Sequence, residues 1–300
     1  MTRLAIGLVA LSLLAFAPTT ASAQSLSPTL QKIKDAGTIT IGHRDSSVPF
    51  SYLDNNQKPI GFSLELCDLV VTKVKAKLNK PDLKVAYQAV NSSNRIPLVK
   101  NGTVDIECGS TANTIARQQE VAYSVIFYAP QFKWLALKSS NLKTTDDLKG
   151  KAVVVTQGTN TAQFVAKLNA EKHLGMKILQ GKDHAESFLL VETGRASAFM
   201  EDDILLAGLK ANAPSPDNFV FLGDAYPSDP YGIMMAKGDD EFKKLVDDAL
   251  VEAMKSGLYD KLYTKWFQSP IPPKNINLNF PQSAELKALI KNPSDKAIGQ

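Results

Sequence analysis

After residue 23 the pattern of apolar and polar positions alternates between short β-rich runs and amphipathic helical stretches. Such alternation is typical of α/β layers in which helices cover largely parallel sheets. The clearest helix is Asp240 to Lys255, where apolar residues recur at the i, i+3, i+4 and i+7 spacing of one helix face. Strands are predicted at residues 38–42, 84–89, 104–106, 133–138, 152–155, 177–179, 198–200 and 219–222.

Two proline-containing segments, residues 127–133 and 223–230, interrupt this alternation and look like crossings between two lobes. Two crossings imply that the second lobe is inserted into the first. A chain of this length also fits two domains of ~100–200 residues each. We therefore expect the first part of lobe 1 at residues 24–129, lobe 2 at 130–227, and the return to lobe 1 with a C-terminal tail at 228–300. Phe280, Leu286 and Leu289 are expected to hold the tail against lobe 1.

The first residues have the features of a leader for export. Thr2-Arg3 gives a positive start, Leu4 to Phe16 is apolar, and Ala21-Ser22-Ala23 fits a cleavage site, which predicts a signal peptide over residues 1–23. A membrane anchor is the alternative, but the apolar run is shorter than the ~20 residues that a spanning helix needs. Charge, Gly or Pro breaks every later apolar run, so we expect a soluble mature chain.

Charge and cysteine content exclude several classes of protein. The formal net charge is +4 without a basic run interleaved with aromatic residues, which argues against nucleic acid as a partner. Three histidines and two cysteines offer no zinc-ligand spacing, so we expect no metal and no cofactor. Cys67 and Cys108 either pair in an oxidising compartment or stay as two buried thiols, and the sequence leaves both open.

In open α/β sheets, ligands bind beyond the carboxyl ends of the strands, where helix N-termini offer free N–H groups. Arg44, Arg95 and Arg117 each follow a predicted strand of lobe 1. A lone arginine in a loop is commonly a solvated charge. Arg95, however, stands in the first turn of a helix, where it opposes the helix dipole, so a bound anion is expected to compensate it. The hydroxyl residues between Ser110 and Thr114 equally fit a helix cap.

Lobe 2 repeats this arrangement. Thr159, Asn160 and Thr161 open a helix whose N–H groups can hold a carboxylate, and no Lys-Ser or Lys-Thr follows at the spacing of a phosphate loop. His184 and Asp202 follow the next two strands. Asp183, and Asp202 or Asp203, equally fit the role of helix N-caps.

Catalytic roles have less support. The sequence has no Gly-x-Ser-x-Gly elbow. Glu107 or Glu201 could serve as an acid or base, but a carboxylate beside arginine is more often part of an ion pair.

These segments together resemble the periplasmic solute-binding proteins of polar amino-acid ABC transporters, in particular their glutamate/aspartate-binding branch. The resemblance covers the mature chain and is carried by GHRDSSVPFSY (42–52), NRIPL (94–98), ECGST (107–111), LKGKAVVVT (148–156), KDH (182–184), WF (266–267) and PIPPKN (270–275). It implies a two-lobed periplasmic-binding-protein fold in the α/β class, with a mostly parallel sheet in each lobe and two hinge strands between them. It also implies a monomer in the periplasm that serves an inner-membrane permease.

The resemblance implies a role for each site residue as well. Arg117, with N–H groups near Ser110 and Thr159 to Thr161, would hold the α-carboxylate of L-glutamate or L-aspartate, and Asp202 would take the ammonium group. The distal carboxylate would be surrounded by Arg44, Ser92, Arg95 and His184, the last adding charge if protonated.

One position departs from the family pattern. Ala112 stands where this family usually has Thr, so either the affinity is lower or the hydroxyl of Thr111 or Thr114 substitutes. An enzyme on the same fold, a lyase or dehydratase acting on a carboxylated substrate, is the alternative function. A sensory ectodomain is a further alternative, and it would need a spanning segment after the lobes.

Overall fold

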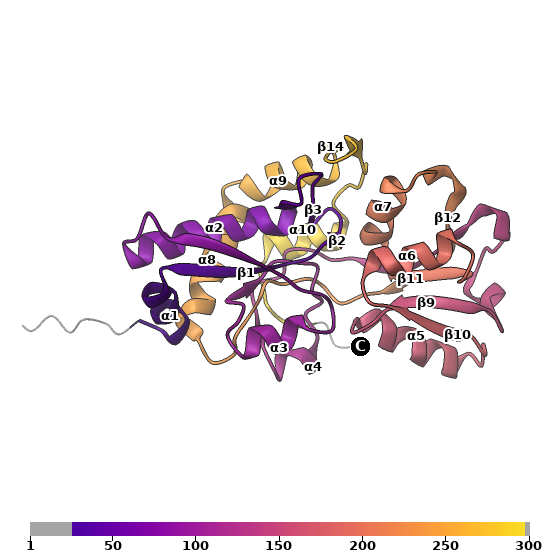
Figure 1. Ribbon diagram of the computed structural model, residues 1–300, viewed down its shortest axis with the longest axis horizontal. Coiled ribbons are helices and arrows are strands. Elements are labelled where there is room, and N and C mark those ends of the chain that lie inside the picture. Colours follow the sequence, from indigo (N-terminus) through magenta and orange to yellow (C-terminus); the bar gives the residue numbers. More distant parts are fainter. Residues whose placement is uncertain (1–25, 298–300) are drawn as a thin grey trace, which may run out of the picture.

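Two five-stranded sheets form the centres of two α/β lobes, which lie side by side along the long axis of the molecule (Figure 1). The computed structural model describes residues 26–297. The predicted signal peptide, residues 1–23, lies outside the described residues. Within the described part of the chain, no helix has the length and apolar character needed to cross a membrane.

The sheet of lobe 1 has the strand order β5-β1-β6-β13-β7. Its strands run in one direction except β13, which pairs antiparallel with both β6 and β7. The strands are β1 (Thr38–His43), β5 (Lys84–Ala89), β6 (Ile106–Glu107), β7 (Ala122–Tyr123) and β13 (Met234–Met235). The strand predicted at 104–106 is thus shifted towards Glu107 in the structure. Strand β13 was not predicted, because two residues are too few to show the alternation of apolar and polar positions.

The sheet of lobe 2 has the order β10-β9-β11-β8-β12, and only β8 runs against the others. Its strands are β8 (Gln131–Leu137), β9 (Ala152–Thr156), β10 (Lys177–Gly181), β11 (Ala198–Asp202) and β12 (Phe219–Pro227). With one reversed strand in each, both sheets are mostly parallel, and the predicted two-lobed α/β class is confirmed.

Helices cover these sheets and supply most of the remaining core. In lobe 1 they are α1 (Pro28–Ala36), α2 (Phe62–Leu78), α3 (Arg95–Lys100), α4 (Ile115–Gln118), α8 (Asp240–Lys255), α9 (Leu258–Phe267) and α10 (Ala284–Lys291). In lobe 2 they are α5 (Asn160–Glu171), α6 (His184–Glu192) and α7 (Asp203–Asn212), with short 3-10 turns η1 (Lys138–Ser140), η2 (Thr145–Leu148) and η3 (Pro216–Asn218). Helix α8 has the predicted bounds, and its apolar stripe is buried against α2.

The smaller strands close the edges of lobe 1. A three-stranded sheet joins β2 (Ser46–Ser47), β3 (Ser51–Leu53) and β4 (Pro59–Ile60), and a hairpin joins β14 (Pro270–Ile271) to β15 (Ile276–Asn277). The tail packs on lobe 1 through buried Leu286 and partly buried Phe280, as expected, whereas Leu289 is only half-buried. Burial of a large apolar side chain such as Leu286 contributes about 1.5–3 kcal/mol to stability.

The two segments that cross between the lobes run side by side. Strands β8 and β12 are antiparallel partners as far as Gln131 and Pro227. Beyond them Tyr128 and Tyr231 form an isolated bridge, in which the N–H of Tyr231 donates to the carbonyl of Tyr128 at 2.8 Å. The crossings are thus tied together at the base of the junction between the lobes.

Cys67 and Cys108 form a disulfide, with their Cα atoms 6.4 Å apart. The sequence left this pairing open. The bond joins the buried face of α2 to the residue that follows β6, and it lies two residues before Ser110, a predicted site residue.

Candidate functional site

The predicted site residues of both lobes meet at the junction between the lobes. Those of lobe 1 follow β1 and β6 or open α3 and α4, and those of lobe 2 open α5 and α6 or end β11. Arg44, Ser92, Arg95, Ser110, Ala112, Thr159, Thr161, His184 and Asp202 are buried, whereas Arg117 and Asn160 are partly exposed. The carboxyl ends of parallel strands bring these segments to one edge of each sheet, as the fold class predicts.

Direct contacts join the lobes across this site. Nη2 of Arg44 lies 3.3 Å from Nε2 of His184, and Nη2 of Arg117 donates to the carbonyl of Gly158 at 3.2 Å. A Cβ on Gly158 would lie 2.8 Å from the carbonyl oxygen of Ser92, so the two backbones touch there. The lobes are therefore closed upon each other.

Several site residues carry buried polar atoms without a hydrogen-bond partner in the described part of the chain. These atoms are Nη1 of Arg44, Oγ of Ser92, Nε of Arg95 and Oγ of Ser110. An unpaired buried polar group costs about 1–3 kcal/mol, and more when it is charged. Four such groups from three separate segments favour a polar ligand that supplies the missing partners.

The three arginines form a cluster of positive charge. The pKa of Arg95 is lowered to about 9. Burial is the largest cause, and the neighbouring Arg117 and Arg44 contribute to the same shift. Burial also lowers the pKa of Arg44, although Glu107 and Glu201 oppose that shift. None of the three forms an ion pair within residues 26–297, so a bound anion would relieve both desolvation and mutual repulsion.

Glu107 and Glu201 do not pair with these arginines in the way the sequence suggested. The hydroxyl of Thr111 donates to Oε2 of Glu107 at 2.6 Å and accepts from Nη1 of Arg95 at 2.6 Å. Thr111 thus links the guanidinium of Arg95 to the carboxylate of Glu107. Sequence reasoning missed this role, because an ion pair was the simpler expectation for a carboxylate beside arginine.

Asp202 ends β11 with its carboxylate turned towards the return crossing. Oδ1 accepts from Oγ of Ser228 at 2.6 Å, and Oδ2 accepts from the hydroxyl of Tyr231. Burial raises the pKa of Asp202 well above its usual value, and Glu201 raises it further. A cation beside this carboxylate would reverse that shift.

The alternative role of an N-cap is wrong for Asp202, whose side chain makes no capping bond to α7. It is right for Asp183, which accepts from the N–H of Glu186 at 2.9 Å. Asp183 therefore has a structural role at the start of α6, and Asp202 remains free for another one.

The side chains at the start of α5 already have partners. Thr159 accepts from the N–H of Ala162 at 3.1 Å, Asn160 donates to Asp229 at 3.0 Å, and Thr161 donates to Oε1 of Glu201 at 2.9 Å. What this helix start can offer a ligand is therefore its backbone N–H groups, as predicted.

Of the two hydroxyl groups expected to replace the missing one at Ala112, the hydroxyl of Thr111 is already used as a donor. Thr111 is held between Arg95 and Glu107, and Thr114 accepts from the N–H of Arg117 at 3.1 Å as the cap of α4. The carbonyl of Ala112 instead accepts from Nη1 of Arg117 at 2.9 Å. That backbone contact orients Arg117 but adds no hydroxyl to the site. Thr114 only accepts in its cap bond, so its hydroxyl hydrogen can still donate to a ligand, and a substitute from Thr114 stays a prediction.

His184 is neutral in this arrangement. Burial lowers its pKa well below the usual value, and Arg44 and Arg95 lower it further. Burial and the two arginines therefore disfavour the extra positive charge that was expected from a protonated ring.

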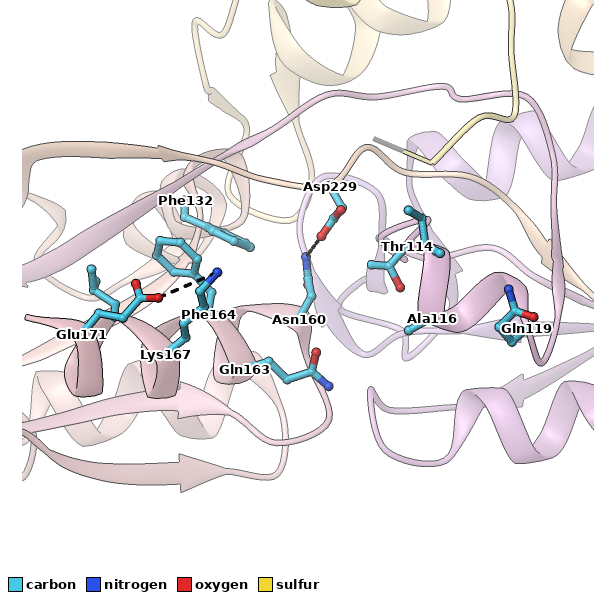
Figure 2. A pocket seen from close by; sticks show the side chains of 12 residues that line it. Thr114, Ala116, Gln119, Phe132, Asn160, Gln163, Phe164, Lys167, Glu171 and Asp229 are labelled. Carbon is cyan, nitrogen blue, oxygen red and sulfur yellow. Dashed lines mark hydrogen bonds and ion pairs between the residues drawn. The ribbon is translucent and has the colours of Figure 1, made fainter. Parts of the chain in front are cut away.

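A prominent open pocket lies outside this cluster. It measures about 560 Å³ and separates α4 from α5, with Phe132 and Asp229 at the crossings among its lining residues (Figure 2). Of the predicted site residues it contains Asn160, whose amide is bonded to Asp229. Its other lining side chains are mostly apolar or neutral. The buried cluster is the better candidate, because its polar atoms lack partners whereas this pocket is open surface.

Comparison with known proteins agrees with this geometry. Residues 39–269 match the family model of the bacterial extracellular solute-binding proteins, family 3. The chain is 53% identical to the L-glutamate/L-aspartate-binding protein of Pseudomonas aeruginosa over 279 residues, which is 93% of this chain and 92% of that protein. It is 48% identical to the glutamate/aspartate import solute-binding protein of Escherichia coli K12 over 277 residues, 92% of each chain. An ancestral arginine-binding protein bound to arginine has a similar structure, with a TM-score of 0.68 at 30% identity over 77% of this chain and 98% of that one.

Proposed function

The chain belongs to family 3 of the bacterial extracellular solute-binding proteins, and from this premise we propose that it captures L-glutamate and L-aspartate in the periplasm. It delivers them, as a monomer, to the permease of an inner-membrane ABC transporter. The signal peptide is cleaved after Ala23 during export. The relatives above are named as binding proteins, so the lyase alternative has no support among them.

One observation carries the choice of ligand: three arginines without ion pairs lie at the junction between the lobes, and so does the buried carboxylate of Asp202, which has no cationic partner within the described residues. A guest with two carboxylates and one ammonium group matches both features. A neutral amino acid would leave one part of the arginine cluster unpaired, and a basic one would add positive charge to it.

The contacts support a division of the site between the two ends of the ligand. Arg117, together with N–H groups at Ser110 and at the start of α5, takes the α-carboxylate, and Asp202 takes the ammonium group. Arg44, Ser92, Arg95 and His184 surround the distal carboxylate. The unpaired atoms of Arg44, Ser92 and Arg95 favour this assignment, because each supplies a free donor to the same end of the site.

Capture proceeds by rotation of the lobes about the two crossings. We place the lobe boundaries after residues 129 and 227, close to Gln131 and Pro227, where the pairing of β8 with β12 ends. Ligand docks first on lobe 1, which supplies all three arginines, and lobe 2 then brings His184 and Asp202 onto it. Closure excludes water and so strengthens every charged hydrogen bond in the site.

Calorimetric titration of the mature protein with glutamate, aspartate, glutamine and cystine tests this function. We expect both acidic amino acids to bind, with affinities that differ by ~1–3 kcal/mol for the single methylene. Glutamine should bind more weakly by about 2–5 kcal/mol, because its amide leaves buried guanidinium charge unpaired. Equal affinity for glutamine and glutamate would refute the assigned roles of Arg44 and Arg95. Recovery of the bound glutamate unchanged distinguishes binding from turnover.

A further inference from the structure

His184 and Glu201 form a buried pair within lobe 2, and each side chain is only 2% exposed. Nδ1 of His184 lies 3.4 Å from Oε2 of Glu201 and 2.9 Å from Oγ1 of Thr156. On the other side of the ring, Nε2 faces Nη2 of Arg44 at 3.3 Å. The imidazole therefore stands between a guanidinium group of lobe 1 and a carboxylate of its own lobe.

These contacts determine where the ring carries its hydrogen when the lobes are closed and no ligand is present. A guanidinium group has only donors, so Nε2 must accept from Arg44 and cannot carry a hydrogen itself. The single hydrogen of the neutral ring is therefore on Nδ1, which lies 2.9 Å from Oγ1 of Thr156 and has the carboxylate oxygen Oε2 of Glu201 3.4 Å away on the same side. Between them, His184 and Glu201 hold one proton in this state.

Binding of the ligand's distal carboxylate changes the number of protons that His184 and Glu201 need. Its oxygens are acceptors, so on binding Arg44 they replace Nε2 as the acceptor of that guanidinium. Nε2 then faces a carboxylate oxygen and contacts it favourably only if it carries a hydrogen. Oε2 of Glu201 still lies 3.4 Å from Nδ1, and a buried carboxylate oxygen at that distance favours a hydrogen on Nδ1 over a bare lone pair. The pair therefore needs two protons in the bound state.

We propose that capture of the acidic ligand loads one proton from solvent onto the His184–Glu201 pair, and that Glu201 is the positioning residue that makes His184 a donor to the ligand. This inference rests on the proposed function and extends it. It makes the site sensitive to a feature that glutamine lacks, namely the negative charge that stabilises the added proton.

The charges around the ring agree with this assignment. Arg44 and Arg95 face His184 from lobe 1 and disfavour a second proton as long as no anion lies between them and the ring. Glu201 faces it from β11, and burial raises the pKa of that carboxyl too. The other charged side chains on the elements packed against α6 form no hydrogen bond or ion pair with the ring among the described residues; they are Lys133, Lys177, Asp202, Asp203 and Lys210. A bound dianion reverses the local field, and the second proton becomes favourable.

A tautomer change without proton uptake is the competing outcome. Thr156 could turn its hydroxyl hydrogen towards Nδ1, since its Oγ1 lies 2.9 Å from Oγ of Ser187, which could then donate to Thr156. That arrangement would place the oxygen Oε2 of an ionised Glu201 against Nδ1 with no hydrogen between them. Oε2 is buried and has no hydrogen-bond partner in the described part of the chain, so nothing there offsets the repulsion.

Titration calorimetry with glutamate in two buffers of different ionisation enthalpy, such as phosphate and Tris at one pH near 7.5, measures the protons exchanged. A difference in observed heat corresponding to an uptake of about one proton per ligand is expected. Equal heats in both buffers would overturn the proposal while leaving the proposed function intact. Absence of binding by both glutamate and aspartate would instead refute the proposed function, and the inference with it.

Two variants locate the proton. Glu201→Gln should lose the proton uptake and weaken glutamate binding roughly tenfold or more, the effect of one hydrogen bond to a charged group. His184→Gln, which has an amide donor that does not titrate, should bind with equal heats in the two buffers. Glu171→Gln removes an exposed carboxylate of the same lobe and should behave as the parent protein. Uptake that persists in Glu201→Gln and in His184→Gln would overturn the assignment.

Discussion

Gly208 of α7 touches the backbone of Val48 across the junction between the lobes. A Cβ built on Gly208 would lie 2.5 Å from the carbonyl oxygen of Val48 and 2.8 Å from its Cβ. Gly208 stands within an ordinary helix, where alanine is preferred over glycine by up to about 1 kcal/mol. The glycine is therefore unfavourable for the helix by itself and favourable for the close approach of the two lobes.

Gly208→Ala should impair closure of the lobes without lowering the stability of the ligand-free protein. The added methyl group prevents the closed packing, at a cost of about 1–3 kcal/mol, so glutamate affinity should fall roughly 5- to 150-fold. The melting temperature without ligand should be equal or higher. Gly223→Ala is the matched control, because its Cβ would meet only the carbonyl of Lys143 at 3.6 Å. Unchanged affinity in Gly208→Ala, measured by calorimetry, would contradict closure through this contact.

Asp202→Asn should abolish capture and stabilise the free protein. Burial raises the pKa of Asp202, so the folded chain holds this proton more tightly than the unfolded chain does. The favourable contribution is then present at low pH and lost as the pH rises through the folded-state pKa. Denaturation by urea without ligand should show a gain for the variant that grows as the pH rises above about 4. Glutamate affinity should fall by about 2–5 kcal/mol. Equal unfolding free energies of the variant and the parent protein at every pH would argue against a buried Asp202 carboxylate that lacks a cationic partner.

Thr111→Val removes the hydroxyl that joins Arg95 to Glu107. Without this link Arg95 is less well oriented, and glutamate affinity should fall by about 1–3 kcal/mol. Because Arg95 is assigned to the distal carboxylate, the ratio of glutamate to glutamine affinity should fall as well. Thr111→Ser should restore both values, and Thr103→Val, an exposed position, serves as the control. An unchanged affinity ratio would mean that Thr111 only supports the fold.

Arg117→Ala and Arg95→Ala distinguish the two ends of the ligand. Arg117→Ala should abolish binding of every amino acid tested, because each has an α-carboxylate. Arg95→Ala should weaken acidic ligands by about 2–5 kcal/mol and leave weak glutamine binding largely as it was. Titration of both variants with the same ligands measures this difference. Equal losses for all ligands in both variants would contradict the proposed division of the site.

The sequence predicted those parts of the site that depend on local position. Arg44 directly follows β1, His184 comes three residues after β10 and Asp202 ends β11, so the rule that ligands bind beyond the carboxyl ends of strands was enough to select them as candidates. The same rule placed the start of α5 at the site. The two proline-containing crossings and the chain length predicted the two lobes.

The partners of these residues could not be predicted in the same way. Ser228 and Tyr231 contact Asp202 from the return crossing, and nothing in their own segment indicates it. Glu201 was recognised only as a candidate acid or base, because its contact with His184 depends on how β11 and α6 pack. Strand β13 escaped detection for a similar reason, since two residues acquire an extended pairing only from the strands on both sides.

The Cys67–Cys108 disulfide links the position of a binding-site segment to the redox state of the compartment that holds the protein. The bond anchors, on the buried face of α2, the start of the segment that contains Ser110 and Ala112. Disulfide bonds persist in oxidising compartments, whereas cysteines are kept as reduced thiols in the cytosol. A copy that lacks this bond holds the segment by packing alone, and we expect it to bind glutamate more weakly. Material purified from a reducing cytoplasm therefore has to be oxidised before any affinity measured on it describes the exported protein.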